Sequence, residues 1–429
     1  MSAKKEHSSN RRNLPIGSRN FLGYHFRSEE RVRTSKNLRL SPDDLERNTN
    51  LVALTRESKR CLRNLGAYKP LKDTFPQPWL PFPRSRRAAV LVALFVGRKG
   101  DLYVLLSKRA TTLRSFAGDT SLPGGKMDPE DKSIEDTARR EAFEEIGLPP
   151  DRNKVPLLCM LEPFYVEKQL LVTPVVVLVL DNTLQPILNA PEVTALFSHP
   201  LASFLSSTPP ASIIRSEPEL VELGDDGSGY RYHTSNDWDW DGPPVLLDPS
   251  ENKLSKNGSA NRNGKKRRSL SNSSLRTFKR SDENEVKASN GPVFRKRKFR
   301  MHQFLTGREA GGIKPVFGLT AAILIHTARA GYSPSPPALA SPDFEVSAPD
   351  GASTSMRIAW AFYRPATSHR PNLLREALEN EGLAGKVDWE RVRKVAGVPD
   401  ENAVFQKGAS SAISGSRRLG QTNRIRSKL

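Results

Sequence analysis

The chain has 429 residues, a length for two or three domains. Hydrophobic residues make up 37% and charged residues 27%, with a formal net charge of +20, so we expect a globular core flanked by long segments that cannot form one. Two cysteines are too few for a disulfide-stapled secreted scaffold or a cysteine-built zinc site, which makes a reducing compartment the default.

Membrane insertion and secretion are not expected. The most apolar stretch, 170–180, is too short for a bilayer and contains Pro174. The N-terminal residues lack the apolar region of a secretory signal, although their basic, serine-containing composition does not exclude a mitochondrial transit peptide.

The positive charge is concentrated in residues 251–300, which hold 16 Lys and Arg against four Asp and Glu. This stretch has few apolar residues and no sustained period, so we predict a long disordered insertion over about 206–292. The basic runs Lys265–Arg268 and Arg295–Lys298 have two interpretations. They could bind nucleic acid or serve as a nuclear address, but we favour a solvated linker because such short runs are common.

Elsewhere, strands and helices alternate, which predicts a mixed sheet covered by helices. Residues 1–40 are expected to be disordered, and 41–86 to hold a helix and a Pro-rich linker. Expected strands cover 88–96, 101–107, 155–162 and 170–179, the first two forming a hairpin. Expected helices cover 41–65, 133–146, 191–205, 319–330 and 372–381.

The helix expected over 133–146 carries three glutamates, Glu141, Glu144 and Glu145, at spacings i, i+3 and i+4. At about 100° per residue they share one arc of the helix and repel one another. A hard divalent cation such as Mg²⁺ or Mn²⁺ would relieve that repulsion, because both ions prefer oxygen ligands. A solvated acidic face is the commoner fate of such a pattern taken alone.

The residues before this helix favour the metal interpretation. Leu122-Pro123-Gly124-Gly125 is a turn that lets backbone approach a ligand closely, and Asp128 and Asp131 follow it. Positive side chains near this turn are Lys108, Arg109, Arg114 and Lys126. A glycine turn, cations for phosphate oxygens and a carboxylate face for metal together suit hydrolysis of a phosphoanhydride.

This stretch resembles the Nudix box, G-x5-E-x7-R-E-U-x-E-E-x-G-U, where U is aliphatic. Its marked positions are filled here by Gly125, Arg140, Glu141, Glu144, Glu145, Gly147 and Leu148. Asp131 replaces the first Glu, eight residues instead of seven separate it from Arg140, and Ala142 is a weak aliphatic. The same one-residue expansion is typical of the coenzyme A diphosphatase branch of the family.

That branch carries a second signature, L-L-T-x-R-[SA]-x3-R-x3-G-x3-F-P-G-G, which residues 105–125 match except for Ser107 and Leu122. Weaker similarity to later family segments lies at 189–193, 199–201 and 317–321. The resemblance implies an α/β fold, an αβα sandwich around a mixed β-sheet, formed by residues 87–333 and interrupted by the insertion. Residues 334–429 would be a C-terminal extension.

The resemblance also implies roles for individual residues. Glu141 and Glu145 would ligate Mg²⁺ or Mn²⁺, and Glu144 would share the metal or help deprotonate water. Arg140 would orient the glutamates by ion pairing. Glu192 would serve as general base or as a further ligand.

Other residues are expected at the substrate. Gly124 and Gly125 shape the loop, and Lys126 lies beside it. Arg109 and Arg114 either contact phosphates or simply hold the loop, and both roles remain open.

The implied activity is cleavage of the pyrophosphate of coenzyme A or an acyl-coenzyme A, giving 3′,5′-ADP and 4′-phosphopantetheine or its acyl form. One alternative is a Nudix hydrolase acting on oxidised nucleotides or dinucleotide cofactors. The other is a non-enzymatic nucleic-acid-binding protein that uses 251–300 and carries a vestigial Nudix domain. The sequence does not indicate the oligomeric state.

The last three residues, Ser427, Lys428 and Leu429, match the tripeptide that a peroxisomal import receptor reads; the alternative is a chance match on a basic tail. We therefore expect a peroxisomal protein, with nucleus, cytoplasm and mitochondrion as alternatives.

Overall fold

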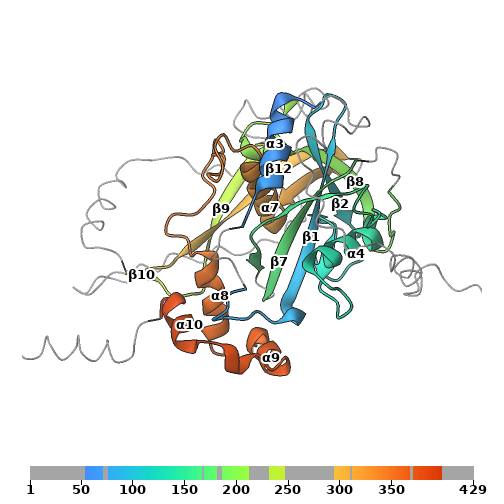
Figure 1. The fold of residues 1–429 in the computed structure, drawn as a ribbon. Helices are drawn as coiled ribbons and strands as arrows, with labels where there is room; N and C mark the ends of the chain where they lie inside the picture. Colours follow the sequence, from blue (N-terminus) through green and yellow to red (C-terminus); the bar gives the residue numbers. More distant parts are fainter. Residues whose placement is uncertain are drawn as a thin grey trace, which may run out of the picture.

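The computed structural model describes residues 54–70, 76–166, 169–180, 186–211, 231–246, 294–309, 312–367 and 371–398. Their main feature is an eight-stranded mixed sheet with helices on both faces (Figure 1). Its strands are β1 (Arg87–Val96), β2 (Leu102–Arg109), β3 (Thr120–Ser121), β4 (Gly124–Lys126), β5 (Leu157–Met160), β6 (Phe164–Val166), β7 (Leu170–Leu178) and β8 (Val193–Pro200). The central order is β3-β2-β1-β7-β5, while β4, β6 and β8 pair with β1, β7 and β2 respectively. Only the β1–β7 pairing is parallel within this sheet as described.

Strand β1 shows why the sequences of the central strands are apolar without interruption. Val92 and Leu94 point to one face, where they share a core with α3 (Arg56–Ala67) and α7 (Gly318–Gly331). Leu91 points to the opposite face, where it packs with α4 (Ile134–Ile146). Because successive side chains of a strand alternate between faces, a strand covered on both sides must be apolar throughout. The αβα sandwich and its mixed sheet are thus confirmed.

Helix α4 has clear start and stop signals in the sequence. The Ser133 hydroxyl caps it by accepting a hydrogen bond from the Asp136 backbone N–H at 3.1 Å. Glu135 and Asp136 place negative charge at the positive end of the helix. Gly147 ends it in a left-handed conformation with φ of 68°.

The helix expected over 191–205 is wrong. Residues Val193–Pro200 form β8, antiparallel to β2, and a short 3₁₀ helix, η2 (Leu201–Leu205), follows. Leu196 and Phe197 pack on the cores of opposite faces of the sheet, as alternating strand residues do. Pairing with the edge of β2 has overridden the local helical preference.

The insertion is only partly as expected, because its described residues contain strands. β9 (His233–Asp239) pairs with β12 (Lys298–Glu309), which also pairs with β13 (Gly312–Phe317). A small second ribbon joins β10 (Val245–Leu246) to β11 (Phe294–Arg295). A strand within the predicted insertion thus pairs with a basic strand that follows it, and Arg300 Nε lies 2.7 Å from Asp237 Oδ1. Residues 212–230 and 247–292, including Lys265–Arg268, lie outside the described residues.

Three C-terminal helices form a separate group at the lower edge of the sheet, near the start of β1 (Figure 1). They are α8 (Thr354–Tyr363), α9 (Leu373–Asn380) and α10 (Trp389–Val395), with a 3₁₀ turn, η4 (Ala384–Lys386), between the last two. Phe362 and Leu374 share a buried core with Leu80, Phe82 and Leu171, from before β1 and from β7. The extension is thereby packed onto the sheet.

Other expectations have definite outcomes. The helix expected over 41–65 is described from Arg56, as α3, whereas 41–53 lies outside the described residues. Both cysteines, Cys61 and Cys159, are buried and free. Within the described part of the chain, no helix has the length and apolar character needed to cross a membrane.

Candidate active site

The three glutamates of α4 lie on the side of the helix that faces β4. Ala138, Ala142 and Ile146 pack on the sheet, which turns the neighbouring acidic side toward the glycine turn. Glu145 is the most buried, with 5% of its side chain exposed. Glu141 and Glu144 show 18% and 37% exposure. The structure therefore brings the acids together at graded depth on one side of the helix.

The two glycines of β4 permit a close approach of backbone and carboxylate. A Cβ on Gly125 would lie 2.3 Å from Glu141 Oε1, a distance that no real Cβ contact shows. A Cβ on Gly124 would lie 2.3 Å from the Ala89 carbonyl oxygen of β1. The Gly124 backbone N–H also points to Glu145 Oε2 at 3.4 Å. A side chain at Gly124 would meet the backbone of β1, whereas one at Gly125 would displace the Glu141 carboxylate.

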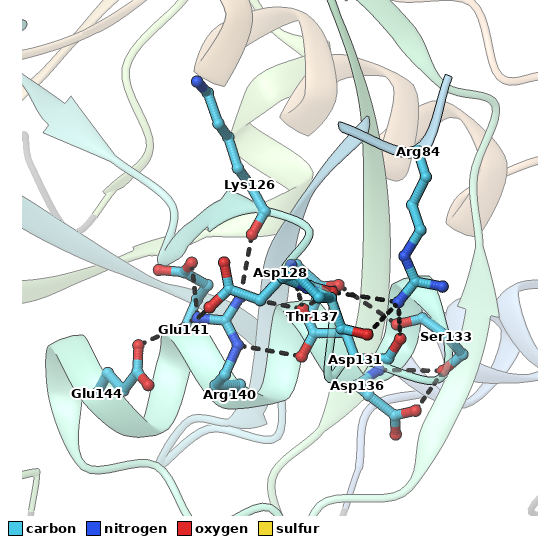
Figure 2. Close-up of polar contacts among 11 residues, drawn as sticks. Arg84, Lys126, Asp128, Asp131, Ser133, Asp136, Thr137, Arg140, Glu141 and Glu144 are labelled. Atoms are coloured by element: carbon cyan, nitrogen blue, oxygen red, sulfur yellow. Dashed lines mark hydrogen bonds and ion pairs between the residues drawn. The ribbon is translucent and has the colours of Figure 1, made fainter. Parts of the chain in front are cut away.

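Arg140 is the centre of the polar network (Figure 2). Its Nε and Nη2 each donate to Asp131 at 3.0 Å, a bidentate arrangement. Its Nη1 donates to Glu141 at 3.0 Å and to Glu144 at 3.2 Å, and Nη2 also donates to the Lys126 carbonyl at 3.0 Å. One guanidinium thus joins the loop before α4 to two of the three glutamates.

Asp131, at the position of the first glutamate of the box, is buried. Besides Arg140, its Oδ2 accepts from the Thr137 hydroxyl at 2.8 Å and from the Asp128 backbone N–H at 2.9 Å. Burial raises the pKa of Asp131, but the hydrogen bonds from Arg140, Asp128 and Thr137 outweigh it and hold that pKa below its usual range. The shorter side chain therefore serves here as a fully bonded anchor for Arg140.

The three glutamates of α4 have raised pKa values, because nearby positive charges do not fully compensate for their burial and mutual repulsion. The pKa of Glu145 is raised to about 8, first by burial and then by the charge of Glu141, with Arg109 acting in the opposite direction. Burial likewise raises the pKa of Glu141 and of Glu144, against the effect of Arg140. A further positive charge beside Glu141 and Glu145 would stabilise both as carboxylates.

A divalent cation fits this donor set by its chemistry. Glu141 and Glu145 offer hard oxygen ligands that are short of positive charge, as Mg²⁺ and Mn²⁺ require. In the arrangement described, the Arg140 side chain bonds Glu141 and Glu144, and no three His, Cys, Asp or Glu side chains of the described residues already converge on one point suited to a metal. An ion held by Glu141 and Glu145 alone would take its remaining ligands from water and substrate oxygens.

The cationic side chains expected at the substrate are placed differently from one another. Arg109 lies at the site, with Nη1 3.7 Å from Glu145 Oε1. Its Nε is buried and has no hydrogen-bond partner among the described residues. Arg114 is exposed in the loop between β2 and β3. Lys126 is exposed and its side chain points away from Arg140 (Figure 2).

Glu192 approaches from the loop before β8. Its charge raises the pKa of Glu144 and of Glu145, which places it within electrostatic reach of both. The loop is attached to the end of α4, since the Asn189 backbone N–H donates to the Glu145 carbonyl at 3.0 Å.

Sequence reasoning missed two residues of this network, Arg84 and Thr137. Thr137 follows the Ser133 cap by one helical turn, so its approach to Asp131 could have been inferred from spacing. Arg84 is far from α4 in the sequence, and no local pattern indicates its contacts. The targeting residues Ser427, Lys428 and Leu429 lie outside the described residues.

Comparison with known proteins gives the family. Residues 85–212 match the family model for the NUDIX domain. An uncharacterized Nudix hydrolase, NudL, of Photorhabdus laumondii is 43% identical over 131 residues, which are 30% of this chain and 67% of that protein. This chain belongs to the Nudix hydrolase family.

Two longer relatives refine the comparison. Nudix hydrolase 15, mitochondrial, of Arabidopsis thaliana is 47% identical over 123 residues, 28% of this chain and 42% of the relative. Peroxisomal coenzyme A diphosphatase 1 of Saccharomyces cerevisiae is 40% identical over 169 residues, 34% of this chain and 49% of the relative. The chain spans about half the length of these relatives or less.

Proposed function

We propose that this chain hydrolyses the pyrophosphate bond of coenzyme A or of its acyl derivatives, giving 3′,5′-ADP and 4′-phosphopantetheine or acyl-phosphopantetheine. The observation that carries the proposal is that Glu141 and the buried Glu145 face the glycine turn, with the Arg109 guanidinium beside Glu145. The substrate class is supported by the similarity to the yeast coenzyme A diphosphatase and by the signature at 105–125.

The roles proposed for the α4 side chains follow from how deeply each is buried and from its ion-pair partners. Glu141 and Glu145, whose pKa values stay raised despite the nearby Arg140 and Arg109, would hold Mg²⁺ or Mn²⁺. Such an ion neutralises charge on the pyrophosphate and lowers the pKa of an attacking water. Arg140 keeps Glu141 and Glu144 oriented through its ion pairs. Glu144, the most exposed of the three, shares the ion or assists the removal of a proton.

The other side chains act on substrate and water. Arg109, whose side chain is partly exposed beside Glu145, contacts a phosphate oxygen through its guanidinium. Arg114 and Lys126, both exposed, reach the substrate only if the loop or side chain moves. Glu192 accepts a proton from water or adds a further ligand. Gly124 and Gly125 keep the turn close enough to the acids for all of these contacts.

Product analysis tests the proposal. Purified chain with coenzyme A and Mg²⁺ or Mn²⁺ should yield 3′,5′-ADP and 4′-phosphopantetheine, and chelation of the metal should stop the reaction. Glu145→Gln should lower kcat by at least about 100-fold, the scale of losing a group that stabilises transition-state charge. Glu57→Gln, the same chemical change at an exposed position of α3, should have no effect. Intact coenzyme A in the wild-type reaction would refute the proposal.

A substrate panel separates the alternatives. Oxidised nucleoside triphosphates and dinucleotide cofactors, offered at equal concentration, should have lower kcat/KM than coenzyme A. If one of them is preferred, the Nudix chemistry stands and the substrate assignment falls. If none is cleaved while nucleic acid binds with a steep salt dependence that disappears on deletion of 251–300, the non-enzymatic alternative is correct.

We also propose the peroxisome as the location, read from the terminal tripeptide. The yeast relative is described as peroxisomal, whereas the Arabidopsis relative is described as mitochondrial. A fluorescent protein fused to the N-terminus, which leaves Leu429 free, should accumulate in peroxisomes. Removal of 427–429 should abolish this, and an unchanged distribution would contradict the assignment.

A further inference from the structure

The C-terminal helices contact the sheet at the turn that precedes β1. This turn, η1 (Arg84–Arg86), begins with two backbone N–H groups that have no partner within the turn itself. The carboxylate of Glu381, at the end of α9, supplies the acceptors. Its Oε2 accepts from Arg84 N at 2.7 Å, and its Oε1 accepts from Ser85 N at 2.9 Å and from the Ser85 hydroxyl at 2.7 Å.

A second attachment fixes the same group of helices independently. Gln169, at the turn between β6 and β7, donates through Nε2 to the Pro371 carbonyl at 2.9 Å and accepts from the Leu374 backbone N–H at 3.2 Å. Its own carbonyl accepts from Arg86 Nε at 3.1 Å. Together with the buried core around Phe362, these bonds set the position of α9 relative to η1.

From η1, the Arg84 side chain reaches the loop that precedes α4 (Figure 2). Its Nη2 donates to the carbonyl oxygens of Asp128 and Pro129, each at 3.1 Å, and to that of Asp131. Three carbonyls turned toward one guanidinium nitrogen give the loop a defined shape. The same loop presents the Asp131 carboxylate to Arg140.

The contacts therefore run without a gap from the C-terminal helices to the glutamates. Glu381 holds the backbone of η1, Arg84 holds the loop, and Asp131 holds Arg140, which bonds Glu141 and Glu144. The family match covers 85–212, so both Glu381 and Arg84 lie outside it.

We infer that Glu381 and Arg84 are positioning residues for the candidate active site, and that the C-terminal helices are a working part of this hydrolase. The inference rests on the proposed function for its catalytic readout. Neither residue contacts the three glutamates; each acts by fixing the loop that fixes Arg140. Loss of Glu381 leaves the fold in place and loosens the loop.

The test compares Glu381→Gln with Glu379→Gln. Both residues are exposed near the end of α9, and within the described residues the Glu379 side chain has no hydrogen bond or ion pair. Glu381→Gln should lower kcat for coenzyme A about tenfold with KM within about twofold, because misplaced catalytic groups reduce the chemical step. Glu379→Gln should match the wild type in activity and melting temperature. Glu381→Gln should still unfold in one transition, at a slightly lower temperature, because two backbone N–H groups lose a charged acceptor.

Hydrogen exchange of the metal-free chain gives a readout independent of activity. The backbone amides of Asp128, Glu130 and Asp131 should exchange about tenfold faster in Glu381→Gln than in Glu379→Gln if the loop opens more often. Arg84→Lys, which keeps the charge but loses the planar fork, should accelerate the same amides less than Arg84→Ala does. Unchanged exchange and unchanged kcat in Glu381→Gln would overturn the inference.

The two proposals fail in different ways. If wild-type chain leaves coenzyme A intact, the proposed function falls, and the exchange data alone decide the positioning role. If wild-type chain cleaves coenzyme A and Glu381→Gln behaves as Glu379→Gln does in both assays, only the positioning role falls.

Discussion

The two glycines of the candidate site differ in whether the atoms around them could make room for a side chain. Gly125 and Gly124 are adjacent, and an added Cβ would meet an atom at 2.3 Å in both cases. At Gly125 that atom is the end of the flexible Glu141 side chain, which can move aside. At Gly124 it is the backbone carbonyl of Ala89 in the central strand, which cannot. The same substitution should therefore affect different properties.

We predict that Gly125→Ala retains most of its stability and loses activity, because only the Glu141 carboxylate must shift. Gly124→Ala should lower the free energy of unfolding by about 1–3 kcal/mol, the usual cost of overpacking. Urea denaturation and kcat for both variants check this. Equal loss of stability in the two variants would contradict the contrast.

Arg140 and Asp131 form the most completely bonded pair of the site. Their side chains are 13% and 5% exposed, and the contact is bidentate. A double-mutant cycle with Arg140→Lys and Asp131→Asn should give a coupling free energy of about 1–3 kcal/mol. Lysine cannot reproduce the fork, so each single variant should be destabilised on its own. A coupling near zero, measured by chemical denaturation, would mean that the two residues act separately.

At the scale of secondary-structure elements, the end of α4 matters because the helix that carries the three glutamates terminates there. Gly147 has φ of 68°, and an added Cβ would also lie 2.9 Å from the Ile187 backbone nitrogen. Its amide hydrogen-bonds to the Phe143 carbonyl at 3.0 Å, which closes the last turn. The loop that contains Asn189 and Glu192 is hydrogen-bonded to the last turn of α4, immediately before Gly147.

We predict that Gly147→Ala lowers the free energy of unfolding by about 1–2 kcal/mol, because a side chain disfavours the left-handed region and the contact is tight. Gly385 is a matched control, since its φ is not in that region and a Cβ there would meet nothing within 4 Å. Thermal melting of Gly147→Ala and Gly385→Ala decides the matter, and similar melting temperatures would refute the argument.

At the scale of the whole molecule, two histidines outside the candidate site, one buried and one partly buried, should make the fold sensitive to acid. Burial lowers the pKa of His199 to about 3, and its Nε2 lies 2.7 Å from the Tyr232 hydroxyl. Burial, followed by the charge of His302, lowers the pKa of His233 to about 4. Both side chains stay neutral in the fold while an unfolded chain would take up protons below about pH 6.5.

Stability should therefore be fully present above about pH 6.5 and fall as the pH decreases toward 4. For His199, which is 1% exposed, the loss at pH 5 is about 2 kcal/mol. Urea midpoints at pH 7 and pH 5 measure it, and His199→Gln should show a smaller difference between the two. An equal difference in the variant would exclude His199 as a source.

A second loss of folding stability is expected at lower pH. Burial raises the pKa of Glu162, but hydrogen bonds from His326, at 2.7 Å, and from Tyr68 outweigh it and bring that pKa to about 2. Its contribution is present above the unfolded value near 4.5 and is lost as the pH falls toward 2. Glu162→Gln should flatten the stability curve in that window alone.

The sequence by itself determined the parts of this protein that depend on near neighbours in the chain. The capped helix with its three glutamates, the glycine turn and the apolar central strands follow from spacing, capping and burial period. Only the tertiary structure decided that 193–200 pairs as a strand, that 233–239 joins 298–309, and that Glu381 and Arg84 reach the loop before α4. Edge pairing and contacts between distant residues depend on which surfaces meet after folding, and no local periodicity records them.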